Sequence, residues 1–396
     1  MAASLNEIID SDARSTVAAE GQHVPPDLEQ LPVHWLLGVP LDPISLATAM
    51  RKIDTALTAR RRLVIATLNV NFLSLASRDP DFRECLLKVE LSVVDGMPLV
   101  WLGRLLGIPG LTRVAGSTLV ERLRRRNSGR QVRTFFFGGD EGVADAANRN
   151  LAASTGDLRG AGSLNPGRGS VEDLSAASIL EAINASNADF LAVALGARKG
   201  HQWIERNRAA LTAPVISHVG AAVGFLAGTL RRAPRLLQRT GFEWLWRLFQ
   251  EPALARRYAG DALFLIREVA SAVVPLLVWR AYAAVAQTSA PITIATDGTN
   301  VEIRGAFVAR TLPELKVAVA TLQASRHDEI VIKLAAISDL DCAALGYLYE
   351  LRHRAHPRER VRVVGSGSLL VRLLRWHRAT ALVGPSHGVR RAARRA

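Results

Sequence analysis

Short apolar runs alternate with helical segments through the first two thirds of the chain, and this alternation constrains the fold more than any other feature. Five runs are predicted as buried strands: residues 62–69, 91–94, 134–137, 188–195 and 213–219. Glycine or polar residues end or follow each run. Strands that alternate with helices favour a doubly wound, mostly parallel α/β sheet. Ligands bind at the carboxyl ends of the strands in such sheets.

Asp42-Pro43 is predicted to open the helix that precedes the first of these strands. Aspartate is a good helix cap, and proline is tolerated at the first helical position.

After a linker the α/β pattern restarts. Short strands are predicted at 292–296, 301–304, 330–334 and 361–364, and helices from Pro313, Asp341 and Ser368. This pattern indicates a second, smaller α/β domain. The predicted organisation is a flexible leader (1–30), a first domain (31–260), an amphipathic helical linker (261–290), a second domain (291–385) and a basic tail (386–396).

The chain has 396 residues, of which 49% are hydrophobic, and a net charge of +14. This size allows two or three domains with their own cores. The charge predicts an acidic partner such as anionic lipid, a nucleoside diphosphate or nucleic acid. Cys85 and Cys342 lie far apart and outside any metal-binding spacing. The cysteines therefore indicate a reducing compartment and neither a disulfide scaffold nor structural zinc.

The apolar stretch Ala262–Ala286 is the longest candidate for a membrane segment. Arg267, Glu268, Pro275 and Arg280 interrupt it. A bilayer span needs about 20 apolar residues, so we expect this stretch to lie on a membrane or to connect the domains. The N-terminus lacks the basic and then apolar pattern of a signal peptide.

Residues 231–258 contain seven arginines, two acidic residues and two tryptophans. Arginine suits a diphosphate because its planar fork donates two parallel hydrogen bonds. Tryptophan beside arginine suits a membrane surface. The alternative is an amphipathic helix with Leu236, Phe242, Leu245 and Leu248 in the core, which leaves the arginines unexplained.

Asp95 follows a predicted strand and precedes glycine, so its carboxylate is expected to face a crevice. There it could act as a general base on a hydroxyl nucleophile, or it could cap the following helix. Thr67 and Asn69 end a neighbouring strand and could hydrogen-bond a sugar, or could be ordinary loop residues.

Two glycine-containing loops are candidates for nucleotide binding. Gly138-Gly139 opens a helix and could approach a phosphate, although a plain strand-to-helix turn explains it equally well. The loop that begins at Gly196 carries Lys199, and the alternative there is a solvated basic surface. His201 in this loop has no carboxylate partner in the sequence and is not expected to act as a base.

Asp79-Pro80-Asp81 has the form of a metal-binding pair but is interpreted as a helix cap, because no apolar strand precedes it. No other carboxylate pair in the first domain suggests a divalent ion, so arginines would have to stabilise a leaving diphosphate.

In this order, the motifs resemble the WecG/TagA/CpsF glycosyltransferase family, also called glycosyltransferase family 26. The resemblance covers residues 38–258. The motifs are Thr67-x-Asn69, Asp95-Gly96, Arg113-x-x-Gly116, the Phe-Phe-Gly-Gly strand end at 136–139, the Gly196 loop with Trp203, Ala227-Gly228-Thr-x-Arg231-Arg232-Ala-Pro, Glu243-Trp244-Leu-Trp-Arg247, and Glu251-Pro252 to Arg257-Tyr258.

This resemblance implies a Rossmann-like hexosyltransferase that needs neither a metal ion nor a cofactor. It would transfer a sugar with inversion from a UDP-sugar to a polyprenyl-diphosphate-linked glycan, in exopolysaccharide or cell-surface polysaccharide biosynthesis. It would lie in the cytoplasm, on the inner face of the cell membrane, in peripheral contact with anionic lipid. In the family, Asp95 matches the base and Thr67 lies in the site. The expected substrate-binding residues are Asn69, Arg113, Gly138, Gly139, Gly196, Lys199, Arg232, Arg247, Arg256 and Arg257.

Two loops depart from the family pattern. The family often has Pro-Lys-Gln-Glu where this chain has Arg198-Lys199-Gly200-His201, and Phe-Asp-Phe where it has Val223-Gly224-Phe225. These departures leave the donor sugar undefined. They also motivate an alternative, a catalytically silent protein that scaffolds or regulates other enzymes. Nucleic-acid binding is not expected, because the basic tail accompanies no recognised nucleic-acid-binding motif.

The second domain resembles a STAS domain, the fold of anti-sigma-factor antagonists. The resemblance rests on the order of strands and helices and on residues 337–346, which are similar to the Asp-Ser-Ser-Gly-Leu-Gly helix start. Cys342, Ala343 and Ala344 occupy the run where regulated members carry a phosphorylated serine, so no phosphoswitch is expected. The domain would then bind a protein or mediate homo-oligomerisation, or it would serve stability alone.

Overall fold

The computed structural model describes residues 32–234, 236–237, 241–288, 290–324, 329–354 and 360–385. The predicted leader and basic tail lie outside these residues. The description below concerns these residues.

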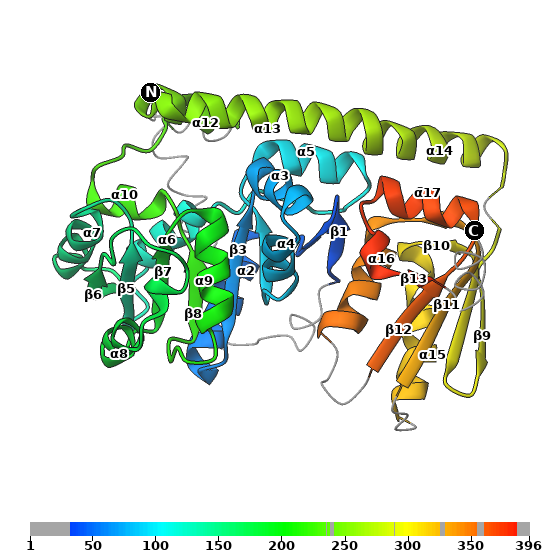
Figure 1. Ribbon diagram of the computed structural model, residues 1–396, viewed down its shortest axis with the longest axis horizontal. Helices are drawn as coiled ribbons and strands as arrows, with labels where there is room; N and C mark the ends of the chain where they lie inside the picture. The colour runs from blue at the N-terminus through cyan, green and yellow to red at the C-terminus, as the bar shows by residue number, and fades with distance from the viewer. Residues whose placement is uncertain are drawn as a thin grey trace, which may run out of the picture. The chain divides into compact units, whose positions relative to one another are not determined.

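A six-stranded parallel sheet forms the first part of the structure (Figure 1). Its order is β4-β3-β8-β7-β5-β6, and every neighbouring pair is parallel. The strands are β3 (Leu63–Leu68), β4 (Leu91–Val94), β5 (Val132–Gly138), β6 (Leu158–Leu164), β7 (Phe190–Ala194) and β8 (Val215–His218). The predicted doubly wound α/β fold is confirmed. The sequence analysis missed β6, whose residues include two glycines and only one fully buried side chain.

Helices cover both faces of this sheet because its strands are apolar on both sides. Ile65 and Val93 belong to one buried cluster, whereas Val64 and Val94 belong to the other. The first cluster packs on α2 (Leu46–Ala59), α6 (Gly116–Arg125), α7 (Val143–Ala152) and α10 (Ala222–Ala227). The second packs on α3 (Val70–Arg78), α4 (Pro80–Leu87), α5 (Met97–Leu105), α8 (Ala177–Ala185) and α9 (Ala197–Asn207).

The helix predicted to open at Asp42-Pro43 begins later, and this prediction was wrong. Ser45 caps α2, and its side chain accepts a hydrogen bond from the Thr48 amide. The Asp42 carboxylate instead accepts a 2.7 Å hydrogen bond from the Ser92 amide, a contact between residues far apart in the sequence. An antiparallel hairpin that was not predicted, β1 (His34–Leu36) and β2 (Val39–Leu41), precedes this point.

The later part of the chain forms a five-stranded sheet in the order β13-β12-β11-β10-β9. Its elements are β9 (Thr293–Asp297), β10 (Asn300–Phe307), α15 (Leu312–Ala324), β11 (Glu329–Leu340), α16 (Cys342–Tyr349), β12 (Arg360–Gly365), α17 (Ser368–Trp376) and β13 (Gly384–Pro385). The predicted helix start at Asp341 is confirmed, since its carboxylate accepts a 2.8 Å hydrogen bond from the Ala344 amide.

A long helical segment connects the two sheets. It comprises α12 (Glu243–Gln250), a short turn at Pro252–Leu254 (η3), α13 (Ala255–Glu268), a π-helical turn at Val269–Val273 (η4) and α14 (Val274–Val285). Figure 1 shows these elements running as one rod past α5 and α3. Pro275 lies in the first turn of α14, where proline is tolerated, so it does not interrupt the helical segment.

The helix from Pro252 to Val285 has 34 residues and a mean hydropathy of 1.9 in its most apolar window. By length and composition alone it could cross a bilayer, and the expectation that it lies on a membrane stays a prediction. Only 28% of that window is buried. Phe264, Ala272 and Leu276 are among its buried residues, and Glu268 pairs with Arg378 beyond α17 at 2.8 Å.

Helix α16 is buried along its whole length and packs on the hairpin. The Tyr349 hydroxyl donates a 2.7 Å hydrogen bond to the Leu87 carbonyl, and the Trp35 indole donates one of 3.1 Å to the His377 carbonyl. A Cβ atom at Gly346 would lie 1.9 Å from the Val33 carbonyl oxygen, so the two backbones are in direct contact. The chain itself therefore covers this face of α16.

Gly346→Ala is expected to lower the free energy of unfolding by about 1–3 kcal/mol or more, because the added methyl group meets backbone that cannot yield. Gly260→Ala is the matched control. Gly260 also lies in a helix, but its Cβ position is open, so alanine there should stabilise by up to about 1 kcal/mol. Urea unfolding of both variants tests this difference. Unfolding of Gly346→Ala at the wild-type midpoint would contradict the close contact.

Candidate active site

The carboxyl ends of β3 and β4 bring Thr67, Asn69 and Asp95 to one edge of the sheet. Thr67 pairs in register with Val93, and the Asp95 amide donates a 2.8 Å hydrogen bond to the Leu68 carbonyl. A Cβ atom at Gly96 would lie 3.6 Å from Asn69 Cβ. The sequence analysis placed Asp95 in a crevice and Thr67 and Asn69 at the end of a neighbouring strand, and the strand register accounts for their closeness.

Asp95 is held by groups from outside its own strand. The Arg113 guanidinium lies 3.4 Å from its carboxylate and donates a 2.5 Å hydrogen bond to its carbonyl. The Gly116 backbone also hydrogen-bonds the carboxylate. Burial raises the pKa of Asp95 above its ordinary value, Arg113 opposes this, and Glu243 adds to it. A raised pKa suits a general base, which works best near the ambient pH.

The alternative role of Asp95 as a helix cap is not observed. Gly96 occupies the cap position of α5, and no side chain makes a capping hydrogen bond there. Asn69, in contrast, does cap a helix: its side-chain oxygen accepts a 3.2 Å hydrogen bond from the Phe72 amide. Its amide nitrogen can still donate a hydrogen bond to a ligand.

Glu243 is a site residue that the sequence analysis did not identify. It is the first residue of α12, its residue exposure is 8%, and its carboxylate lies 2.5 Å from Arg113 Nη2. Arg113 therefore lies between two carboxylates from distant parts of the chain. The sequence did contain a signal for it: Glu243 is an acidic residue at the start of the Glu-Trp-Leu-Trp-Arg motif, within an arginine-rich segment.

Arg232 lies close to the same edge. Its guanidinium donates hydrogen bonds to the side chains of Thr118 at 3.0 Å and Ser117 at 3.4 Å. Both residues belong to the first turn of α6, whose preceding cap residue is Ala115. An arginine beside a helix N-terminus favours an anion, because both supply positive charge and hydrogen-bond donors.

The other predicted arginines lie further along the segment. Arg247 pairs with Glu251 at 2.8 Å, whereas Arg256 and Arg257 are exposed. Among the described residues, none of these three arginines contacts Asp95. Leu236 and Phe242 are 71% and 47% exposed, so the alternative that places them in the core is wrong. Arg235 and Arg239 lie outside the described residues.

The predicted glycine loops form turns at the ends of β5 and β7. Gly138 has a φ of +87°, and a Cβ atom there would lie 2.6 Å from Leu195. The Gly139 amide donates a 2.8 Å hydrogen bond to the Ala194 carbonyl. These contacts support the turn interpretation, and phosphate binding by either glycine stays a prediction.

Gly196 precedes α9 with a φ of +79°, and nothing lies within 4 Å of its Cβ position. Lys199 donates a 2.6 Å hydrogen bond to the Gly169 carbonyl. Substrate binding by Gly196 and Lys199 stays a prediction. Asp79 caps α4 by accepting a 3.0 Å hydrogen bond from the Phe82 amide, which confirms its interpretation as a cap. Within the described residues, no group of three or more His, Cys, Asp or Glu residues could hold a metal ion.

Two buried histidines lie behind the edge. The rings of His201 and His218 are 5.6 Å apart and both face Phe72. Burial lowers the pKa of His201 to about 3 and of His218 to about 4, with His218 contributing to the shift of His201. Both are therefore neutral near pH 7. A Cβ atom at Gly200 would lie 2.6 Å from the His218 ring, so the departure at 200–201 is part of this packing.

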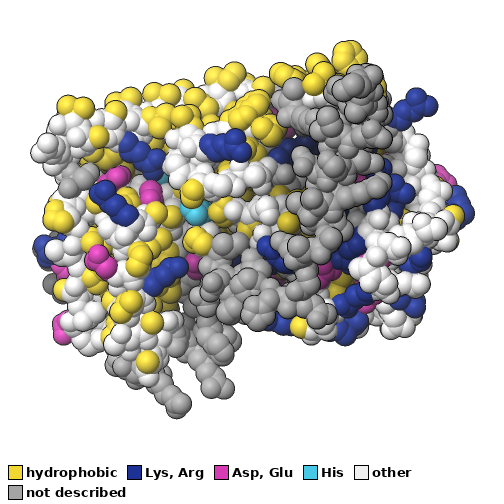
Figure 2. Space-filling view, turned by 180° about the vertical axis from the view of Figure 1, so that it is seen from behind, with side chains coloured by type: hydrophobic (Ala, Val, Ile, Leu, Met, Phe, Trp, Pro, Cys, Tyr) yellow, Lys and Arg dark blue, Asp and Glu magenta, His cyan; other side chains and the backbone are white. Residues whose placement is uncertain are grey.

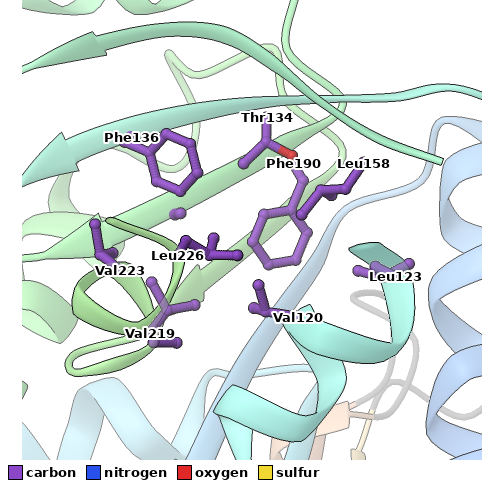
Figure 3. A pocket seen from close by; sticks show the side chains of 11 residues that line it. Val120, Leu123, Thr134, Phe136, Leu158, Phe190, Val219, Val223 and Leu226 are labelled. Carbon is purple, nitrogen blue, oxygen red and sulfur yellow. The ribbon is translucent and has the colours of Figure 1, made fainter. Parts of the chain in front are cut away.

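A separate pocket lies between the sheet and helices α6 and α10 (Figure 3). Val120, Phe136, Phe190 and Val223 are among its lining residues, and Thr134 is the one polar residue there. It contains no charged group, so it is a gap in the apolar core and is not a candidate for the site.

Comparisons with known proteins show which family the chain matches. Residues 34–275 match the model of the Glycosyl transferase WecG/TagA/CpsF family. An N-acetylglucosaminyldiphosphoundecaprenol N-acetyl-beta-D-mannosaminyltransferase from Bacillus spizizenii is 27% identical over 203 residues, which cover 51% of this chain and 77% of that protein. Proteins of the same name from Staphylococcus aureus and Bacillus subtilis are 23% and 25% identical. They cover 54% and 48% of this chain and 84% and 72% of their own lengths.

Among solved structures, an anti-sigma factor antagonist from Mycobacterium paratuberculosis covers 26% of this chain and 92% of its own. It has 18% identity and a TM-score of 0.22. The STAS-like nature of the second α/β region therefore stays a prediction.

The raised pKa of Asp95 predicts how its charge affects stability. A carboxyl whose pKa is higher in the folded chain holds its proton more tightly when folded. Its contribution to stability is therefore present at low pH and is lost as pH rises through the folded pKa. Asp95→Asn is expected to leave the free energy of unfolding at neutral pH unchanged or higher.

Asp157→Asn is the matched control with the opposite sign. Burial alone would raise the pKa of Asp157, but hydrogen bonds from Ser128 and Arg126 outweigh it, and the pKa is lowered. Its charge stabilises the fold above the unfolded pKa, so Asp157→Asn should destabilise at neutral pH. Denaturant unfolding at neutral and acidic pH measures both. Strong destabilisation by Asp95→Asn would show that its charge serves the fold.

Proposed function

The chain belongs to the WecG/TagA/CpsF glycosyltransferase family, and from this premise we propose that it moves a sugar from a UDP-sugar to a polyprenyl-diphosphate-linked glycan acceptor. Membership rests on the family match, which spans more than half of the chain. The relatives' names support the acceptor class, because each names a diphosphoundecaprenol-linked N-acetylglucosamine. The structural observation that carries the proposal is Asp95, held at the strand edge with a raised pKa beside Arg113.

The proposed chemistry is a single displacement. The Asp95 carboxylate accepts the proton of an acceptor hydroxyl, and that oxygen forms a bond to the anomeric carbon of the donor sugar. The bond from this carbon to the UDP oxygen breaks on the opposite face, and UDP leaves with the bonding electrons. Attack opposite the leaving group inverts the anomeric centre.

Positive charge from the protein is proposed to stabilise the leaving diphosphate. Arg232 is the described arginine that best supports this role, because it hydrogen-bonds Ser117 and Thr118, which directly follow the Gly116 backbone that contacts Asp95. Arg247 on α12 and Arg256 and Arg257 in the first turn of α13 continue the basic segment and would meet the acceptor diphosphate. Fixed donors of this kind stabilise developing charge without the reorganisation that water requires.

Contact with a membrane surface is proposed for the long helix. Six large apolar residues are exposed at helical intervals along it: Leu263, Ile266, Val274, Val278, Tyr282 and Val285. Figure 2 shows hydrophobic side chains gathered along the edge that carries this helix. A helix that buries its apolar face in the headgroup region and carries arginines beside it binds anionic bilayers. This contact would place the enzyme at the inner membrane face, where a lipid-linked acceptor is accessible.

Asp95→Asn is expected to lower the rate of UDP release at least about 100-fold, the usual contribution of a general base. The assay uses a UDP-sugar with a polyprenyl-diphosphate-linked N-acetylglucosamine acceptor, and Asp157→Asn serves as control. Transfer should also continue in EDTA. Full activity of Asp95→Asn would contradict the assignment of the base. Absence of UDP release from the wild-type chain across UDP-sugars would favour a silent scaffold.

Leu263→Asp with Ile266→Asp is expected to weaken binding to vesicles of anionic phospholipid by about tenfold or more, because charge replaces apolar surface at the interface. Val317→Asp on α15 is the matched control, since Val317 and Leu263 are both 69% exposed. Co-sedimentation measures the bound fraction, and added salt should reduce it. Equal binding of the double variant and the control would contradict the proposed orientation.

A further inference from the structure

The ion pair between Arg113 and Glu243 joins the strand edge to the start of α12. Glu243 lies 130 residues after Arg113 in the chain, yet its carboxylate is 2.5 Å from the guanidinium. The same guanidinium nitrogen lies 3.4 Å from Asp95. Arg113 Nη2 is thus closer to the Glu243 carboxylate than to the Asp95 carboxylate.

The backbone around Glu243 is pressed against the loop that carries the base. Gly241 has a φ of +84°, and a Cβ atom there would lie 2.6 Å from the Met97 side chain. Met97 follows Asp95 by two residues. The position needs glycine because of both its left-handed conformation and this contact. The start of α12 therefore docks on the loop 95–97.

We propose that Glu243 is a positioning residue for Asp95, which rests on the function proposed above. It holds the Arg113 guanidinium out of a full ion pair with the base, so that Asp95 is ready to accept a proton only when α12 is docked. The long apolar helix follows α12 within a few residues, so contact of that helix with a lipid surface and readiness of the base depend on one continuous segment.

Electrostatics explain why this arrangement matters. The charged groups that face Asp95 in the described part of the chain are Arg113 and Glu243, and the Gly116 amide is its backbone neighbour. A carboxylate paired fully with arginine is a weak base, because the neighbouring positive charge stabilises its ionised form. Arg113 is shared with Glu243. Burial and the Glu243 charge raise the pKa of Asp95 by more than the Arg113 charge lowers it, so the pKa is raised.

The test is the pH dependence of kcat/KM for UDP release by Glu243→Gln. Without the competing carboxylate, Arg113 can form a full ion pair with Asp95 and lower its pKa. The acid limb of the profile, the low-pH range in which kcat/KM falls as Asp95 is protonated, should therefore move to lower pH by roughly one unit. At neutral pH, kcat should fall by about threefold to tenfold, because the base is weaker. KM for the UDP-sugar should change little.

Glu205→Gln is the matched control. Glu205 is half-buried on α9 and pairs with Lys88 at 3.2 Å and Arg208 at 3.4 Å, away from Asp95. The acid limb of the kcat/KM profile of Glu205→Gln should coincide with that of the wild type. A purely structural role for Glu243 would lower the amount of active enzyme without moving the limb, and that result would overturn the proposal.

Glu243→Asp decides the question if Glu243→Gln does not fold. The shorter side chain keeps the charge but withdraws from Arg113, so the limb should move part of the way to lower pH, and an unmoved limb would overturn the proposal. If Asp95 is not the base, Asp95→Asn should remain active. This result distinguishes failure of the proposed function from failure of the role proposed for Glu243.

Discussion

The Arg113 guanidinium is the interaction on which the organisation of the site depends. It contacts the carboxylate and the carbonyl of Asp95, and it pairs with Glu243 from the start of α12. Pairing stabilises partly buried charges, and the shared guanidinium brings the Asp95 and Glu243 carboxylates to one place. The strand edge, the loop after β4 and the C-terminal segment are therefore parts of one site.

The second α/β region is tied to the first by direct backbone contact. Helix α16 packs on the hairpin, and Cys342, Ala343 and Ala344 at its start are buried. The expectation that no phosphoswitch operates there stays a prediction. A protein partner of this region would have to use a face other than that of α16, because the chain itself covers α16.

Much of the fold follows from local pattern. The strands at 62–69 and 91–94 and the helix start at Asp341 could be predicted because burial and capping are encoded within a few residues. Asp95 could be predicted because it follows an apolar run at the ligand-binding edge. Glycine-rich β6 carries no such signal. Asp42 was misassigned because its partner, the Ser92 amide, lies 50 residues away.

The remaining site residues depend on contacts that no local pattern contains. Glu243 pairs with Arg113 across 130 residues, and Gly200 on α9 is required by the position of His218 on β8. The basic segment at 231–258 suggested phosphate binding from composition alone. The structure adds that Glu243 contacts the arginine beside the proposed base and that Arg232 contacts α6.

The pH profile of kcat/KM for the wild-type enzyme tests the central claim most directly. If Asp95 is the base, with Arg113 shared between two carboxylates, the acid limb should lie above about 3.9, the ordinary pKa of an aspartyl carboxyl. An acid limb at or below that value, in enzyme that is still folded, would contradict the account, because it would describe a carboxylate fully paired with arginine.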